Sequence, residues 1–174
     1  MKLFIASDIH GSAYYADLMV KAFAASGADK LVLLGDILYH GPRNDLPRDY
    51  APKKVTEYLN PLGDKIIAVR GNCESEVDQM VLTFPVASDY GVFFDGTRTI
   101  YLSHGHRAVP PMAAGTAYLT GHTHVPKNTT ENGVACMNPG SVSIPKENSP
   151  HSYMIYENGT FVWFDLETGK QYTV

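Results

Sequence analysis

The chain begins Met1-Lys2-Leu3-Phe4-Ile5-Ala6-Ser7-Asp8-Ile9-His10-Gly11, a short apolar run that leads into an aspartate, a histidine and a glycine. The unbroken apolar stretch is typical of a strand buried on both faces, as the strands of a parallel sheet are. The polar residues follow at its carboxyl end, which is where open α/β sheets bind their ligands. This stretch therefore predicts both the fold class and the place of a functional site.

The first half of the chain repeats this alternation of strand and helix. Strands are predicted at residues 2–7, 30–35 and 65–70, and helices at residues 12–26, 53–60 and 74–82. Such an order predicts parallel pairing with right-handed crossovers. In the helix at 74–82 we expect Val77, Met80 and Val81 to face the core.

After Pro85 the pattern changes to β-rich runs joined by hairpin turn signals. These signals are Asp95-Gly96, Asn132-Gly133 and Asn158-Gly159. The second half is therefore expected to be mainly antiparallel and to form a second sheet packed on the first, with helices outside. No linker, repeat or low-complexity tract interrupts the chain, so residues 1–174 are predicted to form a single domain.

Composition excludes several classes of protein. The chain is 44% hydrophobic and 18% charged, which is typical of a globular protein. The net charge is −4 and the lysines and arginines are scattered, so stable binding to duplex nucleic acid is not expected. We expect a cytoplasmic protein without membrane contact, because no signal peptide or apolar span stands out and Cys73 and Cys136 are too few for a disulfide framework.

Five apolar runs end in residues that can bind a metal ion. They are followed by Asp8-Ile9-His10, Gly35-Asp36, Gly71-Asn72, Ser103-His104-Gly105-His106 and Gly121-His122-Thr123-His124. Because side chains alternate along a strand, we expect Asp8 and His10 to project to one side, and likewise the two histidines of the last segment. Neighbouring glycines allow sharp turns and a close approach of the backbone to a ligand.

These residue types predict a particular metal chemistry. Imidazole nitrogens and carboxylate or amide oxygens, without a thiolate, suit Mn²⁺, Fe²⁺ or Zn²⁺ better than a structural zinc site. A carboxylate has two oxygens and can bridge two cations. Two such cations, roughly 3.5–4 Å apart, share a hydroxide and clamp an in-line displacement at phosphorus. The residues therefore predict a dinuclear centre that acts on a phosphate.

Two features have simpler interpretations. A single histidine is usually structural or on the surface, and His40 and His151 are expected to be so. The proline-rich residues 41–52 are either a surface loop or a loop that enters the site directly after Asp36. In the second case Arg43 would be available to bind a phosphate.

The ordered motifs resemble those of the calcineurin-like metallophosphoesterase superfamily over residues 2–146. That family's order is Asp-x-His, Gly-Asp, Gly-Asn-His-Asp/Glu, Gly-His and Gly-His-x-His. Longer matches resemble the small bacterial phosphodiesterases of the YfcE type. These are Ala6-Ser7-Asp8-Ile9-His10-Gly11-Ser12, His40-Gly41-Pro42-Arg43-Asn44, Val69-Arg70-Gly71-Asn72-Cys73 and Asn138-Pro139-Gly140-Ser141-Val142-Ser143-Ile144-Pro145.

The resemblance implies an α/β fold, a four-layer αββα sandwich of two mixed β-sheets flanked by helices. It also implies two divalent metal ions per chain, Mn²⁺ first, with Fe²⁺, Zn²⁺ or Ni²⁺ as alternatives. One ion would take Asp8, His10, Asp36 and His124. The other would take Asp36, Asn72, His104 and His122, with Asp36 bridging the two.

Other site residues also follow from the resemblance. Asn72 would face the phosphate in a catalytic role, and His106 would touch substrate or orient a ligand. Arg43, Asn72 and Cys73 are the predicted substrate-binding residues. Most relatives have histidine at position 73, which puts leaving-group protonation there in doubt. The short segment 107–121 leaves little room for a covering helix, which predicts an open pocket.

Three functions remain to be compared. The first is a metal-dependent phosphodiesterase that hydrolyses a small diester by attack of a metal-bridging hydroxide. The second is a phosphomonoesterase of the same fold, and Cys73 argues against it. The third is a non-catalytic scaffold such as the retromer subunit; members of that class tend to lose metal ligands, whereas none is substituted here. A homo-oligomer is expected from the resemblance alone.

Overall fold

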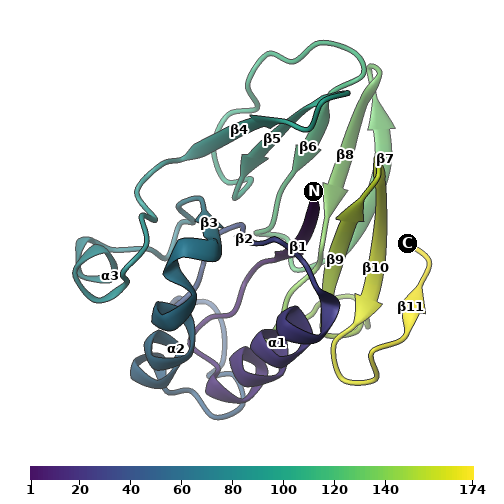
Figure 1. The fold of residues 1–174 in the computed structure, drawn as a ribbon. Coiled ribbons are helices and arrows are strands. Elements are labelled where there is room, and N and C mark those ends of the chain that lie inside the picture. The colour runs from purple at the N-terminus through teal and green to yellow at the C-terminus, as the bar shows by residue number, and fades with distance from the viewer.

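The computed structural model describes residues 1–174 as two mixed β-sheets packed face to face (Figure 1). The six-stranded sheet has the order β11-β10-β9-β1-β2-β3. Its strands are β1 (Lys2–Ala6), β2 (Lys30–Leu33), β3 (Ile66–Ala68), β9 (Ser152–Glu157), β10 (Thr160–Asp165) and β11 (Gln171–Tyr172). The five-stranded sheet has the order β4-β5-β6-β8-β7. Its strands are β4 (Tyr90–Phe94), β5 (Thr99–Ser103), β6 (Ala117–Leu119), β7 (Lys127–Glu131) and β8 (Val134–Asn138).

All helices lie in the first half of the chain. They are α1 (Ala13–Ser26), α2 (Pro52–Leu59), the 3-10 helix η1 (Asn60–Lys65) and α3 (Glu76–Val81). The Ser12 side chain caps the start of α1, and Gly27 ends it in a left-handed conformation, close to the predicted bounds 12–26. The β5–β6 connection contains no helix, which agrees with its short length. No helix is long and apolar enough to cross a membrane.

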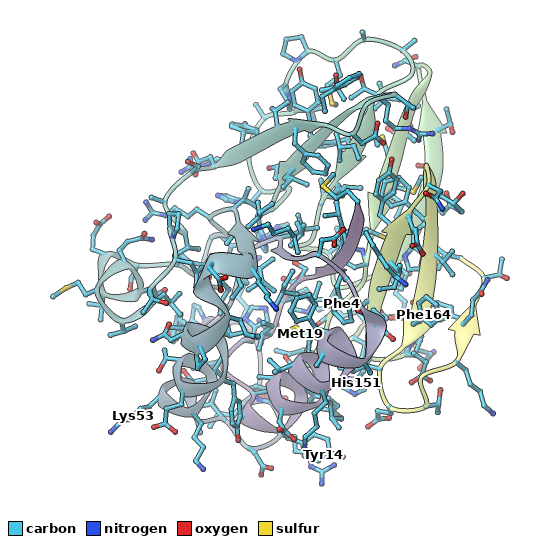
Figure 2. All side chains as sticks on the ribbon, in the orientation of Figure 1. Phe4, Tyr14, Met19, Lys53, His151 and Phe164 are labelled. Carbon is cyan, nitrogen blue, oxygen red and sulfur yellow. The ribbon has the colours of Figure 1, made fainter.

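Two apolar layers hold the sheets and helices together. Phe4 of β1 packs with Met19 of α1 in the layer between the first sheet and the helices (Figure 2). Leu3 and Ile5 of the same strand belong to the layer between the two sheets, with Trp163 of β10. Strand β1 is thus buried on both faces, and it pairs in parallel with β2, as its apolar run predicts.

The expectation of one antiparallel second sheet is wrong in two respects. The C-terminal hairpin of β9 and β10 joins the first sheet, where β9 pairs antiparallel with β1. In the second sheet, β5 and β8 both pair in parallel with β6. The hairpins themselves are present, with positive φ at Asn132-Gly133 and Asn158-Gly159. Turn residues fix which strands form a hairpin, but long-range packing decides which sheet the hairpin joins.

The predicted orientation of α3 is also wrong. Val77, Met80 and Val81 are 60%, 81% and 43% exposed, although they were expected to face the core. A capping box between Ser75 and Asp78 starts this helix, and Asp78 is buried. In a helix of six residues, this inward-facing cap turns the apolar face outward.

Candidate metal centre

The predicted ligands lie in tight turns just beyond the strand ends. Strands β1, β2 and β6 have already ended where these residues occur. Five of them have the left-handed backbone that residues other than glycine rarely adopt: Asp8 (φ 57°), His10 (φ 48°), Asp36 (φ 54°), His122 (φ 68°) and His124 (φ 62°). The expectation that strand alternation places Asp8 beside His10 is therefore wrong, because both residues lie in a turn after the strand. Strained backbone of this kind is common at functional sites.

Backbone hydrogen bonds connect the turn after β1 to the turn after β2. The amide of Asp8 donates to Gly35 O (3.2 Å), and the amide of His10 donates to Asp36 O (2.9 Å). The Ser141 hydroxyl donates to the carbonyl of Asp8 (2.8 Å). A left-handed backbone at a residue other than glycine costs about 1–3 kcal/mol, and these hydrogen bonds hold the turns in that conformation.

Glu74 joins two of these turns, a role the sequence did not reveal. Its carboxylate accepts hydrogen bonds from the amides of Asp36 (2.9 Å), Ile37 (2.6 Å) and Gly71 (2.5 Å). Gly71 lies so close that a Cβ there would overlap the Asp36 carboxylate. Burial and the nearby Asp36 charge raise the pKa of Glu74 to about 7. The only signal in the sequence was its place after Gly71-Asn72-Cys73.

A first set of candidate ligands converges at one end of this sheet edge. His10 Nε2 lies 3.3 Å from His124 Nε2 and 3.6 Å from Asp8 Oδ1, and His124 Nε2 lies 3.4 Å from the same oxygen. Asp36 Oδ2 is 3.7 Å from His10 Nε2. Ligand atoms bound about 2.1 Å from one ion are separated by about 3.0–3.5 Å, so Asp8, His10 and His124 lie close to the spacing that one cation needs, and Asp36 lies slightly farther from His10.

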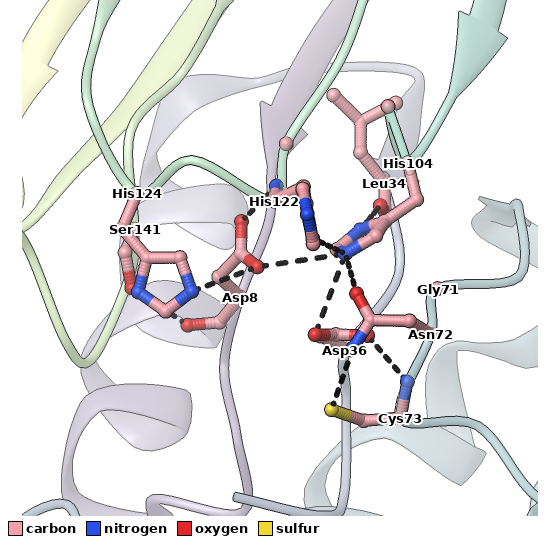
Figure 3. A network of polar contacts seen from close by, with 12 residues as sticks. Asp8, Leu34, Asp36, Gly71, Asn72, Cys73, His104, His122, His124 and Ser141 are labelled. Atoms are coloured by element: carbon pink, nitrogen blue, oxygen red, sulfur yellow. Dashed lines mark hydrogen bonds and ion pairs between the residues drawn. The ribbon is translucent and has the colours of Figure 1, made fainter. Parts of the chain in front are cut away.

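A second set converges on the other side of Asp36 (Figure 3). His104 Nε2 lies 3.1 Å from Asn72 Oδ1, 3.3 Å from His122 Nδ1 and 3.4 Å from Asp36 Oδ2. The same Asp36 oxygen therefore lies between His10 of the first set and His104 of the second. The structure brings all seven predicted metal ligands to one edge. Asp8, His10 and His124 form one compact group, and Asp8, Asp36 and His104 form another, so the division into two sets of four stays a prediction of the resemblance.

Backbone carbonyls orient three of the four imidazoles. The Nδ1 atoms of His10, His104 and His124 lie 2.7–2.8 Å from the carbonyl oxygens of Tyr39, Leu34 and Ile144. Because a carbonyl can only accept, Nδ1 carries a hydrogen and Nε2 is the nitrogen that faces the site. His122 is different, since it presents Nδ1 to the second set.

Asp8 provides the test of whether a cation fits. Its Oδ1 is completely buried and has no hydrogen-bond partner, although buried polar atoms are almost always paired. The nitrogens of His10, His104 and His124 lie within 4.0 Å of this oxygen. An unpaired carboxylate oxygen that faces three imidazole nitrogens is the environment that a divalent cation stabilises.

The charges of the site are strongly coupled. Burial acts to raise the pKa of Asp36, but the His104 imidazole outweighs it and holds that pKa well below its usual range. Burial acts to lower the pKa of His104, but Asp36 and Asp8 raise it to about 9. The pKa values of His122 and His124 are lowered, chiefly by burial, which keeps both rings neutral. A cation that binds His104 must therefore displace a proton.

A cavity of about 360 Å³ opens over part of this edge. Asp36, Asn72, His122 and His124 line it, whereas Asp8, His10 and His104 lie behind it. Gly41–Asn44 form another part of its wall, which favours the interpretation of residues 41–52 as a loop that enters the site. Arg43 and Lys146 contribute the cationic side chains, and Lys146 was not singled out from the sequence.

Cys73 and His106 occupy different places relative to the cavity. Cys73 lines it, and its backbone amide donates to Asp36 Oδ1 (2.9 Å). Burial and the Asp36 charge raise the pKa of the thiol, so it stays protonated. His106 does not line the cavity. Its ring centroid lies 5.4 Å from that of His104 and 6.2 Å from that of His122, so it adjoins the second ligand set from outside.

Comparison with known proteins places the chain in a family. Residues 1–160 match the model of the calcineurin-like phosphoesterase superfamily domain. The chain belongs to this superfamily. Phosphodiesterase YfcE from Escherichia coli K12 is 47% identical over 162 residues, which cover 91% of this chain and 88% of that protein.

Solved structures of other superfamily members agree. The structure of YfcE, a phosphoesterase from E. coli, superposes with a TM-score of 0.96 at 44% identity, covering 99% of this chain and 97% of that one. Wild-type Vps29 from Entamoeba histolytica, solved with Zn²⁺, has a TM-score of 0.63 at 17% identity, covering 99% and 96%. The second likeness shows the fold alone. The match to YfcE confirms an α/β fold with two mixed sheets flanked by helices.

Proposed function

We propose that this protein is a metal-dependent phosphodiesterase with a dinuclear centre. The observation that carries the proposal is the position of Asp36 Oδ2 between two converging ligand sets at the base of a cationic cavity. The 47% identity to a protein named as a phosphodiesterase supports the choice of reaction. The buried, unpaired oxygen of Asp8 supports the presence of a cation.

The residues of the chain have separable tasks in this proposal. Asp8, His10, Asp36 and His124 would hold one ion, and Asp36, Asn72, His104 and His122 the other. Two divalent ions bound there supply Lewis acidity, which activates water for attack on phosphorus and offsets the phosphate charge. Asn72 is exposed at the cavity, where its amide can also donate to a phosphate oxygen. Arg43 and Lys146 can bind the outer phosphate oxygens.

The donor set favours Mn²⁺ over Mg²⁺. Four imidazoles face the site, and Mg²⁺ prefers oxygen ligands and keeps several of its waters. Fe²⁺, Zn²⁺ and Ni²⁺ also accept such a set and remain alternatives. A cytoplasmic location and a homo-oligomer stay predictions.

Hydrolysis of monoesters is the second candidate. A monoester carries more negative charge than a diester, and its chemistry would benefit from a proton donor at position 73. The Cys73 thiol has a raised pKa and is a weak hydrogen-bond donor, which disfavours this function. A non-catalytic scaffold ranks third, because none of the predicted metal ligands is substituted in this chain.

The experiment is reconstitution after treatment with a chelator. The stripped protein should be inactive, and Mn²⁺ should restore hydrolysis of phosphodiesters ahead of Mg²⁺. Phosphomonoesters screened in parallel separate the two enzymatic functions, and inactivity on both classes would favour the scaffold. Equal rescue by Mg²⁺ would contradict the imidazole-rich site.

A further inference from the structure

A second hollow adjoins the metal cavity and differs from it in chemistry. It has a volume of about 430 Å³ and lies between α2 and α3. Apolar and aromatic side chains, among them Leu38, Tyr39, Tyr50, Val77 and Val81, line it together with the charged Lys53 and Asp78. We call this hollow the apolar groove. Cys73 lines both the apolar groove and the metal cavity, so the two spaces meet at that residue.

Tyr39 of the groove wall and Cys73 at the junction are each hydrogen-bonded to a predicted metal ligand. The Tyr39 carbonyl orients the His10 imidazole, while its side chain lines the groove. The Cys73 amide donates to the Asp36 carboxylate (Figure 3). Its side chain lines both the groove and the cavity. Movement of either backbone would disturb a metal ligand. The groove therefore keeps a fixed position relative to the phosphate site.

The groove also explains why apolar residues of α3 are exposed. Val77 and Val81, four residues apart, lie on one face of the helix and both line the groove. Tyr39, which is 43% exposed, lines it too. Exposed apolar area that gathers in a concave surface beside polar catalytic groups is typical of a ligand site.

We propose that the apolar groove binds an aromatic or other apolar ester substituent of the substrate. This inference rests on the proposed phosphodiesterase function. The phosphate would lie on the metal centre, and one ester oxygen would direct its substituent past Cys73 toward Tyr39, Val77 and Val81. The other substituent would remain on the polar side, near Arg43 and Lys146. The natural substrate is then a diester with one apolar and one polar substituent.

The test uses phosphonates, which carry one substituent each and are not hydrolysed at the carbon–phosphorus bond. Binding of phenylphosphonate, methylphosphonate and inorganic phosphate to the Mn²⁺-loaded protein is measured by calorimetry. Phenylphosphonate should bind about tenfold more tightly than methylphosphonate, since a ring buries more apolar area than a methyl group. In the double variant Val77→Ser/Val81→Ser this ratio should fall below about twofold, with phosphate affinity unchanged.

Met80→Ser is the matched control, because Met80 is on the same helix, is 81% exposed and does not line the groove. It should keep the wild-type ratio. Equal affinity of the two phosphonates for the wild type, or a wild-type ratio in the double variant, overturns the inference while diester hydrolysis persists. Failure of all three probes to bind, together with no diester hydrolysis, overturns the proposed function instead.

Discussion

The two candidate ligand sets differ in how far their side chains are exposed to solvent. In the first set, Asp8, His10 and His124 are at most 3% exposed. In the second set His104 is buried, but His122 is partly exposed and Asn72 is exposed. We call the first set the enclosed site and the second set the open site. We expect the enclosed site to bind its cation more tightly and the open site to receive the phosphate.

The segment after β8 accounts for much of this difference. Ser141 and Ser143 donate to the carbonyl of Asp8, and the Ile144 carbonyl orients His124. These contacts all act on the first set. In the second set, the Leu34 carbonyl orients the His104 ring, and the Cys73 amide donates to the shared Asp36 carboxylate. Asn72 and His122 are left with side chains that line the cavity.

The largest effect is expected where the two sets meet. Asp36→Asn removes charge from the shared oxygen and should weaken both sites, with a loss of diesterase activity of at least about 10³-fold. Metal content, measured by elemental analysis, should fall in parallel. Asp45→Asn is the control, because Asp45 is an exposed residue outside the cavity. Normal turnover in Asp36→Asn would show that the ligand assignment is wrong.

Removal of an open-site ligand should separate metal content from activity. Asn72→Ala should keep one ion per chain in the enclosed site, yet lose about 10²–10³-fold in kcat, because a ligand and a phosphate donor are lost together. His10→Ala, in the enclosed set, should instead lose the more tightly held ion. Loss of both ions in Asn72→Ala would contradict the claim that the enclosed site holds its ion more tightly than the open site.

A moderate effect is expected at Cys73, on the open side. General-acid help is worth about 10²–10⁴-fold, and a thiol with a raised pKa supplies little of it. The rate should therefore depend steeply on leaving-group pKa, and aryl diesters should be far better substrates than alkyl diesters. Cys73→His should flatten this dependence and speed poor leaving groups by up to about 10²-fold. A shallow slope in the wild type would point to another acid, such as His106.

The smallest effect is expected at the rim of the open site. Arg43→Ala should raise KM for a diester by about tenfold with little change in kcat, since a charge-assisted bond to the outer phosphate is lost. Arg48→Ala is matched to it, because Arg48 is on the same loop but lies over the Tyr14 ring, away from the cavity. Equal effects of the two substitutions would remove Arg43 from the binding site.

The sequence predicted the parts of this molecule that depend on local patterns. Apolar runs located β1 and β2, helical spacing located α1, and strand ends located the candidate ligands. Parallel strands bring their carboxyl ends to one edge of a sheet, so the convergence of these residues also followed. The family resemblance, rather than spacing, divided them into two sets.

Other features depend on contacts that no local pattern shows. The left-handed turns at Asp8 and His10 are held by bonds to residues far away in the chain, including Ser141. Glu74 looks like an ordinary acidic residue until three amides meet at its carboxylate. The apolar spacing in α3 predicted burial, but the buried cap at Asp78 turned that face outward. These contacts also decide where the groove beside the metal centre lies.

The central claim is that Asp36 joins two adjacent cations, and the spin coupling of bound Mn²⁺ tests it most directly. The protein loaded with Mn²⁺ should contain two ions per chain and give the multiline electron paramagnetic resonance spectrum of an exchange-coupled pair. In Asp36→Asn the coupled signal should disappear. A single ion per chain, or two ions with the six-line spectrum of isolated Mn²⁺, would contradict a shared carboxylate.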